Sequence, residues 1–285
     1  MIPLKDNIPT SRFPIVTVVL IALNVLAFVW QLSLSGEPGS ASGELAGASD
    51  LSERDAAALE YGAIPFRITH PGDECEVASR PESASAVICA GTPAARELAG
   101  DPNVTTAPLD AIPWWLTVIT SMFLHAGFLH LAGNMLFLWV FGNNVEDSMG
   151  RGRFVAFYLL SGIVAVYAQA LLDIEATGPT IGASGAVAGV LGGYALLYPQ
   201  ARVLTMVILP FFLTWIEIPA MVMLGIWFVL QFLPVVGQLA IPDVVGDAGI
   251  AYLAHVGGFL FGLAVIRLFA NRWREKLAGA PHPVH

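Results

Sequence analysis

The chain has 285 residues, of which 56% are apolar and only 12% are charged, and its formal net charge is −9. Soluble domains carry about a quarter charged residues, so this composition excludes an ordinary soluble protein and indicates that lipid is the main solvent. The sequence has no cluster of lysine and arginine suited to a phosphate backbone, which excludes nucleic-acid binding.

Six apolar stretches are long enough, or nearly so, to cross a bilayer, which takes about 20 helical residues. We therefore predict an all-α, polytopic membrane protein with a bundle of six transmembrane helices. The first stretch is longer than the apolar core of a signal peptide, so we interpret it as a retained span. The predicted spans are residues 13–34, 127–146, 153–172, 183–199, 218–238 and 250–270.

Charges beside the spans predict the orientation of the chain. Lysine and arginine flank the spans on one side, whereas the short loops 173–182 and 239–249 on the other side carry only acidic charges. Because basic residues concentrate in cytoplasmic loops, both termini are predicted to be cytoplasmic. An alanine- and glycine-rich chain without a transit peptide favours a bacterial plasma membrane, with organelle membranes as the alternative.

The segment between spans 1 and 2 carries the whole net charge, because its 13 acidic side chains face four arginines, a balance of −9. It also holds both cysteines, Cys75 and Cys89, which an oxidising outer compartment would allow to form a disulfide. Its glycine, serine, alanine and proline content predicts partial disorder, and a solvated tether is favoured over an element that gates or recruits substrates. The predicted parts are residues 1–35 (cytoplasmic N-terminus and span 1), 36–113 (acidic insertion), 114–271 (core) and 272–285 (cytoplasmic tail).

Two further apolar segments are harder to place in a membrane. Residues 112–119 are too short to span but aromatic enough to lie in the interface. Residues 203–216 are apolar, but Pro210 and the neighbouring Glu217 argue against a separate crossing. For this second segment we predict an interfacial or re-entrant element.

Span 2 contains polar side chains of the kind that mark function inside a membrane. His130 and Asn134 are four residues apart and therefore share one helix face, with His125 just upstream. A metal site is one interpretation of the two histidines, but no cysteine or carboxylate within the membrane completes a set of ligands. We therefore predict no metal, and no motif for a cofactor occurs.

Span 4 opens with Gly182-Ala183-Ser184-Gly185, which places a hydroxyl at a helix N-terminus. The free backbone N–H groups and the helix dipole favour negative charge there, as an oxyanion requires. Taken alone, such a string more often serves close helix packing. The motif becomes informative only together with a histidine in span 6.

His255 lies one helical turn before Gly258, and Gly258 and Gly262 repeat at the four-residue spacing of small residues in packed helices. Packing that face against the glycines of span 4, beginning with Gly185, would bring the imidazole to Ser184. Histidine is the usual base that activates a serine at neutral pH. No acid in the spans orients His255, so the pattern predicts a dyad rather than a triad.

The motifs of spans 2, 4 and 6 together resemble the rhomboid family, and the resemblance extends to Glu146 after span 2 and covers about residues 115–271 plus span 1. It implies an intramembrane serine endopeptidase with Ser184 as nucleophile and His255 as base. His130 and Asn134 would stabilise the oxyanion, and His125 would brace the loop before span 2. A departure is Ala188, where some members place an aromatic ring against the histidine.

The resemblance implies transmembrane proteins as substrates, cut within or beside their membrane helices, in contact with membrane lipid. Substrate identity and oligomeric state are not predicted. Two alternatives stay open: a non-catalytic relative that binds membrane helices, and a transporter or proton pathway through the polar core. The second lacks an internal repeat and an acidic relay within the spans.

Overall fold

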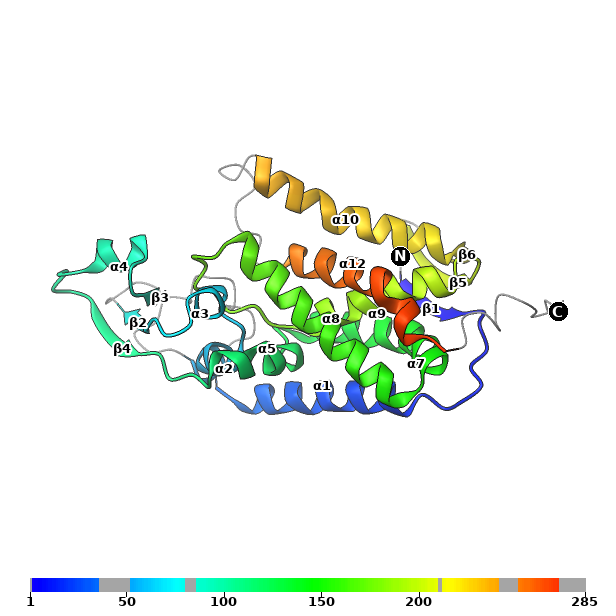
Figure 1. Cartoon of the computed structure of the whole chain (residues 1–285), viewed down its shortest axis with the longest axis horizontal. Helices are drawn as coiled ribbons and strands as arrows, with labels where there is room; N and C mark the ends of the chain where they lie inside the picture. The colour runs from blue at the N-terminus through cyan, green and yellow to red at the C-terminus, as the bar shows by residue number, and fades with distance from the viewer. Residues whose placement is uncertain (1, 36–51, 80–85, 210–211, 241–250, 272–285) are drawn as a thin grey trace.

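The computed structural model describes residues 2–35, 52–79, 86–209, 212–240 and 251–271. The predicted tail 272–285 and much of the loop 239–249 lie outside these residues. The described chain forms an elongated helical bundle with a small disulfide-bonded unit at one end and a three-stranded sheet at the other (Figure 1). The predicted class, a polytopic helical membrane protein, is confirmed.

Four helices of the described chain are long and apolar enough to cross a membrane: α1 (Ile15–Ser33), α8 (Arg151–Leu172), α10 (Ala220–Ala240) and α12 (Tyr252–Phe269). A fifth candidate is the pair Trp114–Phe123 and Phe128–Met149, which bends by 84° at the break between them. Helix α9 (Ser184–Leu197) has only 14 residues. The count of six spans therefore stays a prediction.

The bent pair consists of five successive helical pieces. A helix α5 (Trp114–Thr120) and a 3-10 turn (Ser121–Phe123) precede the break, where the sequence predicted an interfacial segment. After the break come α6 (Phe128–Phe137), a π-helical stretch (Leu138–Gly142) and α7 (Asn143–Met149). The break places His125 between two helices instead of inside one.

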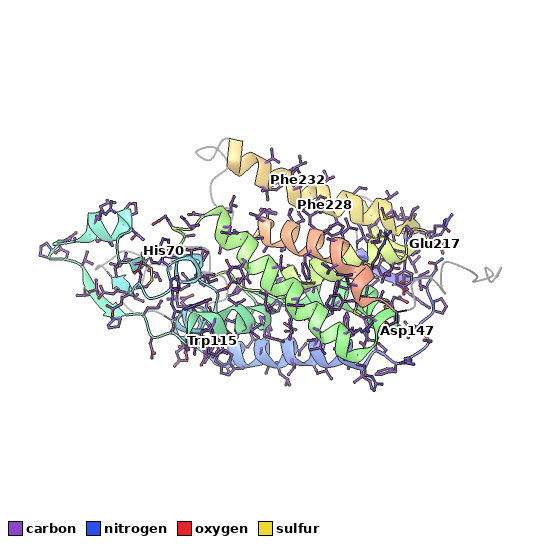
Figure 2. All side chains as sticks on the ribbon, viewed as in Figure 1. His70, Trp115, Asp147, Glu217, Phe228 and Phe232 are labelled. Carbon is purple, nitrogen blue, oxygen red and sulfur yellow. A yellow bond between two sulfur atoms is a disulfide. The ribbon has the colours of Figure 1, made fainter. Side chains whose placement is uncertain are left out.

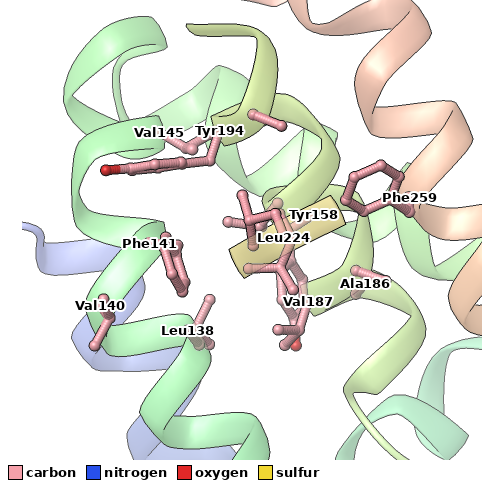
Figure 3. Packing of buried hydrophobic residues seen from close by; sticks show 14 of the residues in the cluster. Leu138, Val140, Phe141, Val145, Tyr158, Ala186, Val187, Tyr194, Leu224 and Phe259 are labelled. Atoms are coloured by element: carbon pink, nitrogen blue, oxygen red, sulfur yellow. The ribbon is translucent and has the colours of Figure 1, made fainter. Parts of the chain in front are cut away.

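Helix α9 is the centre of the bundle, and nearly all of its residues are buried. It is rich in glycine and alanine because α8 and α12 approach its backbone closely: a β-carbon at Gly262 would lie 1.9 Å from the carbonyl oxygen of Gly189. Larger side chains from the surrounding elements also pack in this core, including Phe141, Tyr158 and Leu224 (Figure 3).

Acidic side chains connect the ends of these elements. The carboxylate of Glu146 in α7 accepts hydrogen bonds from the backbone N–H groups of Val16 and Thr17, at 3.0 and 2.8 Å, and from the Thr17 hydroxyl at 2.8 Å. These N–H groups belong to the first turn of α1 and have no partner within their helix. Asp147, at the same end of the bundle in Figure 2, accepts hydrogen bonds from Ser11. The two acids thus fix the beginning of α1 to α7.

The described parts of segment 203–216, residues 203–209 and 212–216, form β-strands and are not among the candidate membrane spans, in agreement with the prediction that this segment makes no separate crossing. Its predicted place in the membrane interface stays a prediction. These residues lie in the hairpin of β5 (Arg202–Leu209) and β6 (Phe212–Pro219), and β1 (Ile2–Asp6) pairs antiparallel with β5. Along β5, Val203 and Thr205 are buried and Leu204 is exposed. This alternation is typical of a half-buried strand, and the high apolar content concealed it.

The acidic insertion also differs from the predicted tether. Its described part, residues 52–79 and 86–113, forms a unit that we call the disulfide subdomain. An antiparallel sheet of order β3-β2-β4 carries a disulfide between Cys75 and Cys89, which lie opposite each other. Its elements are α2 (Glu53–Tyr61), α3 (Pro65–Thr69), β2 (Cys75–Ser79), β3 (Ala86–Cys89), α4 (Pro93–Leu98) and β4 (Thr105–Pro108).

A separate apolar cluster explains why this subdomain folds. Leu59, Ile64 and Phe66 from the helical part pack with Val77 and Val87 of the sheet, around the disulfide. The overall composition of the insertion hides this cluster, because the apolar residues are few and widely spaced in sequence. A disulfide commonly supports a core of this size.

Candidate active site

Ser184 and His255 meet at one end of the close contact between α9 and α12. Ser184 is the first residue of α9, and its Oγ lies 2.7 Å from Nε2 of His255 in α12. The contact depends on small residues, because a β-carbon at Gly258 would lie 2.1 Å from the carbonyl oxygen of Gly185. Ser184 and His255 are 71 positions apart in the sequence. The structure therefore brings together the two residues that the sequence analysis had singled out.

The position of Ser184 at a helix start has a chemical consequence. The first N–H groups of α9 have no acceptor within the helix and form the positive end of its dipole. Negative charge that develops beside Ser184 is stabilised by these groups. The loop before the helix approaches through Gly182, whose φ of 125° disfavours any other residue and whose N–H donates to the carbonyl oxygen of Ser121 at 2.8 Å.

His130 lies against this loop from α6. A β-carbon at Gly182 would be 2.8 Å from Cε1 of His130, so only glycine leaves room for the imidazole. Asn134, one turn further along α6, donates from Nδ2 to the carbonyl oxygen of His130 at 3.0 Å. Both side chains line the cavity that contains Ser184 and His255.

His125 is placed behind His130 instead of in the cavity. It is buried, and its ring meets that of His130 edge to face with 5.1 Å between centroids. Its backbone N–H donates to Oε1 of Gln31 in α1 at 3.0 Å, so α1 fixes the chain where the bent pair breaks. This geometry agrees with a bracing role and gives no direct access to a substrate. Sequence reasoning missed Gln31, although it is a rare polar side chain in span 1.

The cavity has a volume of about 740 Å³ and is lined by residues of both α6 and α10. Leu129, Phe137 and Trp227 give it apolar walls, and Gln169 and Gln231 add amides to its lining. The loop from Asp173 to Ile181 forms another wall, and Pro65 extends the lining into the disulfide subdomain. A cavity of this size accommodates a short stretch of extended peptide together with water.

The loop wall of the cavity is attached to the disulfide subdomain by backbone hydrogen bonds. Ala63 and Thr180 exchange two such bonds, of 3.1 and 2.8 Å, as an antiparallel bridge. The backbone N–H of Phe66 donates to the carbonyl oxygen of Ala176 at 3.0 Å. In addition, the side-chain hydroxyl of Thr69 lies 3.1 Å from the carbonyl oxygen of Ile174. The insertion is thus part of the structure that shapes the cavity.

Gln231 is the site residue that sequence reasoning missed. Its Oε1 lies 2.7 Å from Nδ1 of His255, on the side of the imidazole opposite Ser184. A polar amide within an otherwise apolar span is a usable signal, but its partner is 24 residues away on another helix and the sequence gives no pairing. Within the described residues, no group of three or more His, Cys, Asp or Glu side chains is arranged to hold a metal ion.

Comparison with known proteins agrees with the geometry. A model of the rhomboid domain family matches residues 113–272. The chain is 32% identical over 152 residues to Rhomboid protein 1, mitochondrial, of Saccharomyces cerevisiae. This match covers 52% of the present chain and 40% of the yeast protein. It is 28% identical over 177 residues to the Presenilin-associated rhomboid-like protein, mitochondrial, of Bos taurus. This match covers 58% of the present chain and 44% of the bovine protein.

A bacterial relative matches more closely over a shorter stretch. The chain is 45% identical over 85 residues to Rhomboid protease GluP of Bacillus subtilis, which covers 30% of this chain and 16% of that protein. In all three comparisons the match spans less than half of the relative's length.

Proposed function

The chain belongs to the rhomboid family, and on that premise we propose that it is an intramembrane serine endopeptidase that cleaves transmembrane proteins. The observation that carries this proposal is the 2.7 Å contact between Ser184 Oγ and His255 Nε2 inside a cavity of a membrane protein. A hydroxyl within hydrogen-bond reach of an imidazole is the geometry of an activated nucleophile.

In the proposed reaction, Ser184 Oγ attacks the carbonyl carbon of the scissile peptide bond while its proton passes to Nε2 of His255. The carbonyl oxygen becomes an oxyanion, which the N–H groups at the start of α9 and the side chains of Asn134 and His130 stabilise. His255 then gives the proton to the leaving amine as the peptide bond breaks. In the second half-reaction His255 takes a proton from a water molecule that attacks the acyl carbon, and it returns this proton to Ser184 Oγ as the carboxyl product leaves.

Asn134 can serve the oxyanion without giving up its present partner. Its Nδ2 carries two hydrogens, and one of them donates to the backbone carbonyl of His130 in the same helix. The second hydrogen can donate to an oxyanion that develops in the cavity, while the first bond holds the amide in place. Catalytic hydrogen bonds commonly form only in the complex with substrate.

The proposed substrates are transmembrane segments that can leave the helical conformation. A membrane helix satisfies its own carbonyl groups, which shields the scissile bond from a nucleophile. The polar lining of the cavity, with Gln169, Thr180 and Asn134, offers hydrogen-bonding groups to an unwound backbone. We expect residues with low helix propensity near the cleaved bond.

The proposed location is a bacterial plasma membrane, with both termini in the cytoplasm and the disulfide subdomain outside. The charge distribution beside the spans supports this orientation. A disulfide in the subdomain suits an oxidising outer side. Two of the relatives carry the word mitochondrial in their names, so an organelle membrane is the alternative.

The test is cleavage of a fluorescent single-span reporter by the purified protein in liposomes. The parent protein is expected to cut the reporter, and Ser184→Ala and His255→Ala are expected not to. Ser33→Ala is a matched control, because among the described residues this hydroxyl donates to the carbonyl oxygen of Trp30 in its own helix and lies outside the cavity. Cleavage by Ser184→Ala at the parental rate would refute the mechanism. Binding of the reporter without cleavage by the parent would favour the non-catalytic alternative.

A further inference from the structure

The imidazole of His255 is held from both sides, and the second contact comes from α10. Gln231 Oε1 lies 2.7 Å from Nδ1 of His255, and Ser184 Oγ lies 2.7 Å from Nε2. The neighbours of Gln231 along α10 face lipid, since Leu230 and Leu233 are both 58% exposed. Gln231 itself is turned inward and is only partly exposed. An amide that points into lipid would leave its polar groups unpaired, so the inward position is strongly favoured.

We propose that Gln231 is a positioning residue that sets the tautomer and orientation of His255 for proton transfer. This inference rests on the proposed protease function. A neutral imidazole carries one proton, so one ring nitrogen donates and the other accepts. The side-chain oxygen of glutamine can only accept, which places the proton on Nδ1 and leaves the lone pair on Nε2 facing Ser184. This is the tautomer that a general base requires.

Gln231 keeps this role after the proton has moved. When His255 takes the serine proton at Nε2, both ring nitrogens are donors, and the glutamine oxygen continues to accept from Nδ1. The imidazolium thus retains a partner without a full negative charge beside it. No carboxylate hydrogen-bonds His255 in the part of the chain that the structure describes, so Gln231 takes the place that an acid has in a catalytic triad.

Helix α10 also supplies an aromatic contact to the histidine. The ring of Trp227, one turn before Gln231, lies 6.0 Å from that of His255. On α9, the residue one turn after Ser184 is Ala188, which is fully buried and brings no ring to the site. Phe228 of α10 packs on Phe259 of α12 with 4.8 Å between centroids, and Figure 2 shows it on α10 above α12. The packing of α10 on α12 therefore determines where the base lies.

The test compares Gln231→Met and Gln231→Glu in the liposome assay, with kcat, KM and the pH profile as readouts. Methionine keeps the length of the side chain but cannot accept the Nδ1 proton. Because general-base catalysis contributes about 10² to 10⁴-fold, we expect kcat to fall about 10- to 100-fold with KM little changed. Leu230→Met, at a lipid-facing position of the same helix, is the matched control and should behave as the parent.

Gln231→Glu distinguishes positioning from a structural role. The carboxylate of Gln231→Glu can still accept the proton on Nδ1, so we expect this variant to keep most of the activity that Gln231→Met loses. Its negative charge favours the imidazolium form of His255. The base must be neutral to act, so the acid limb of the pH profile is expected to move to higher pH by about one unit. Among the described residues, the other titratable groups near His255 are His130 from α6, Tyr252 on α12 and Asp173 on the cavity lining, and these are the same in all variants.

Two outcomes would overturn the inference: a Gln231→Met enzyme with kcat within twofold of the parent, or equal losses in Gln231→Met and Gln231→Glu with no shift of the acid limb. If Gln231→Met fails to fold, Gln231→Glu and its pH profile decide the question alone. Failure of the proposed function is recognised separately, because the parent protein itself would then leave the reporter uncut.

Discussion

The glycine contact between α9 and α12 makes the distance between nucleophile and base sensitive to a single methyl group. In Gly258→Ala, the new β-carbon would lie 2.1 Å from the carbonyl oxygen of Gly185, whereas real β-carbons keep at least 3.0 Å. Helix α12 must therefore move away by about 0.9 Å, the difference between these two distances. Forcing an extra methyl group into a packed interface typically costs about 1–3 kcal/mol.

The displacement acts directly on the dyad, because Gly258 is one turn from His255 and Gly185 follows Ser184. A shift of that size along the hydrogen bond lengthens the 2.7 Å contact to about 3.6 Å, beyond the reach of a general base. A misplacement of about 1 Å can cost 10²-fold in rate. We expect Gly258→Ala to cleave a transmembrane reporter about 10²-fold more slowly than the parent.

Gly225→Ala is the matched control, because Gly225 also lies in an apolar helix but a β-carbon there meets nothing within 4 Å. Both variants are measured in liposomes for cleavage and in detergent for thermal unfolding, which shows whether each is folded. Folded Gly258→Ala protein that cleaves within about threefold of the parent would refute the reasoning, because the rate would then not depend on the α9–α12 distance.

Three further variants test other parts of the account. Asn134→Ala is expected to lower kcat about 10²-fold with little change in KM, as for the loss of one oxyanion donor; a rise in KM alone in steady-state kinetics would contradict the role. Glu146→Gln weakens the cap of α1 and should lower the free energy of unfolding by about 1–2 kcal/mol in detergent, whereas Glu175→Gln in an exposed loop should not. Joint replacement of Cys75 and Cys89 by serine removes a bridge worth about 3 kcal/mol. The disulfide subdomain should then be cut faster in limited proteolysis, and an unchanged digestion rate would argue against a stabilising bridge.

The sequence located the residues of the site well because polar groups stand out in apolar spans. Ser184, His255, His130 and Asn134 were each identifiable, and the structure brings all four to one cavity. Gln231 escaped notice because its partner His255 is 24 residues away on another helix, whereas Asn134 stands four residues after His130 on the same helix. The role of Gln231 depends on a contact between two helices, which no spacing within one helix can predict.

The features that the sequence did not reveal share another cause. The apolar content of residues 203–216 concealed a strand, β5, in which alternate residues are buried and which pairs with β1 from the start of the chain. In the insertion, the average composition concealed a small apolar cluster around a disulfide. Both features depend on which residues meet across long sequence separations, and local composition carries little of that information.

The most direct test of the central claim is whether Ser184 is an activated serine. The purified protein is incubated in detergent or liposomes with a fluorophosphonate probe, and the labelled residue is located by mass spectrometry. We predict label on Ser184, absent from Ser184→Ala and strongly reduced in His255→Ala. Folded parent protein that takes up no label, or label that persists in Ser184→Ala, would contradict the account.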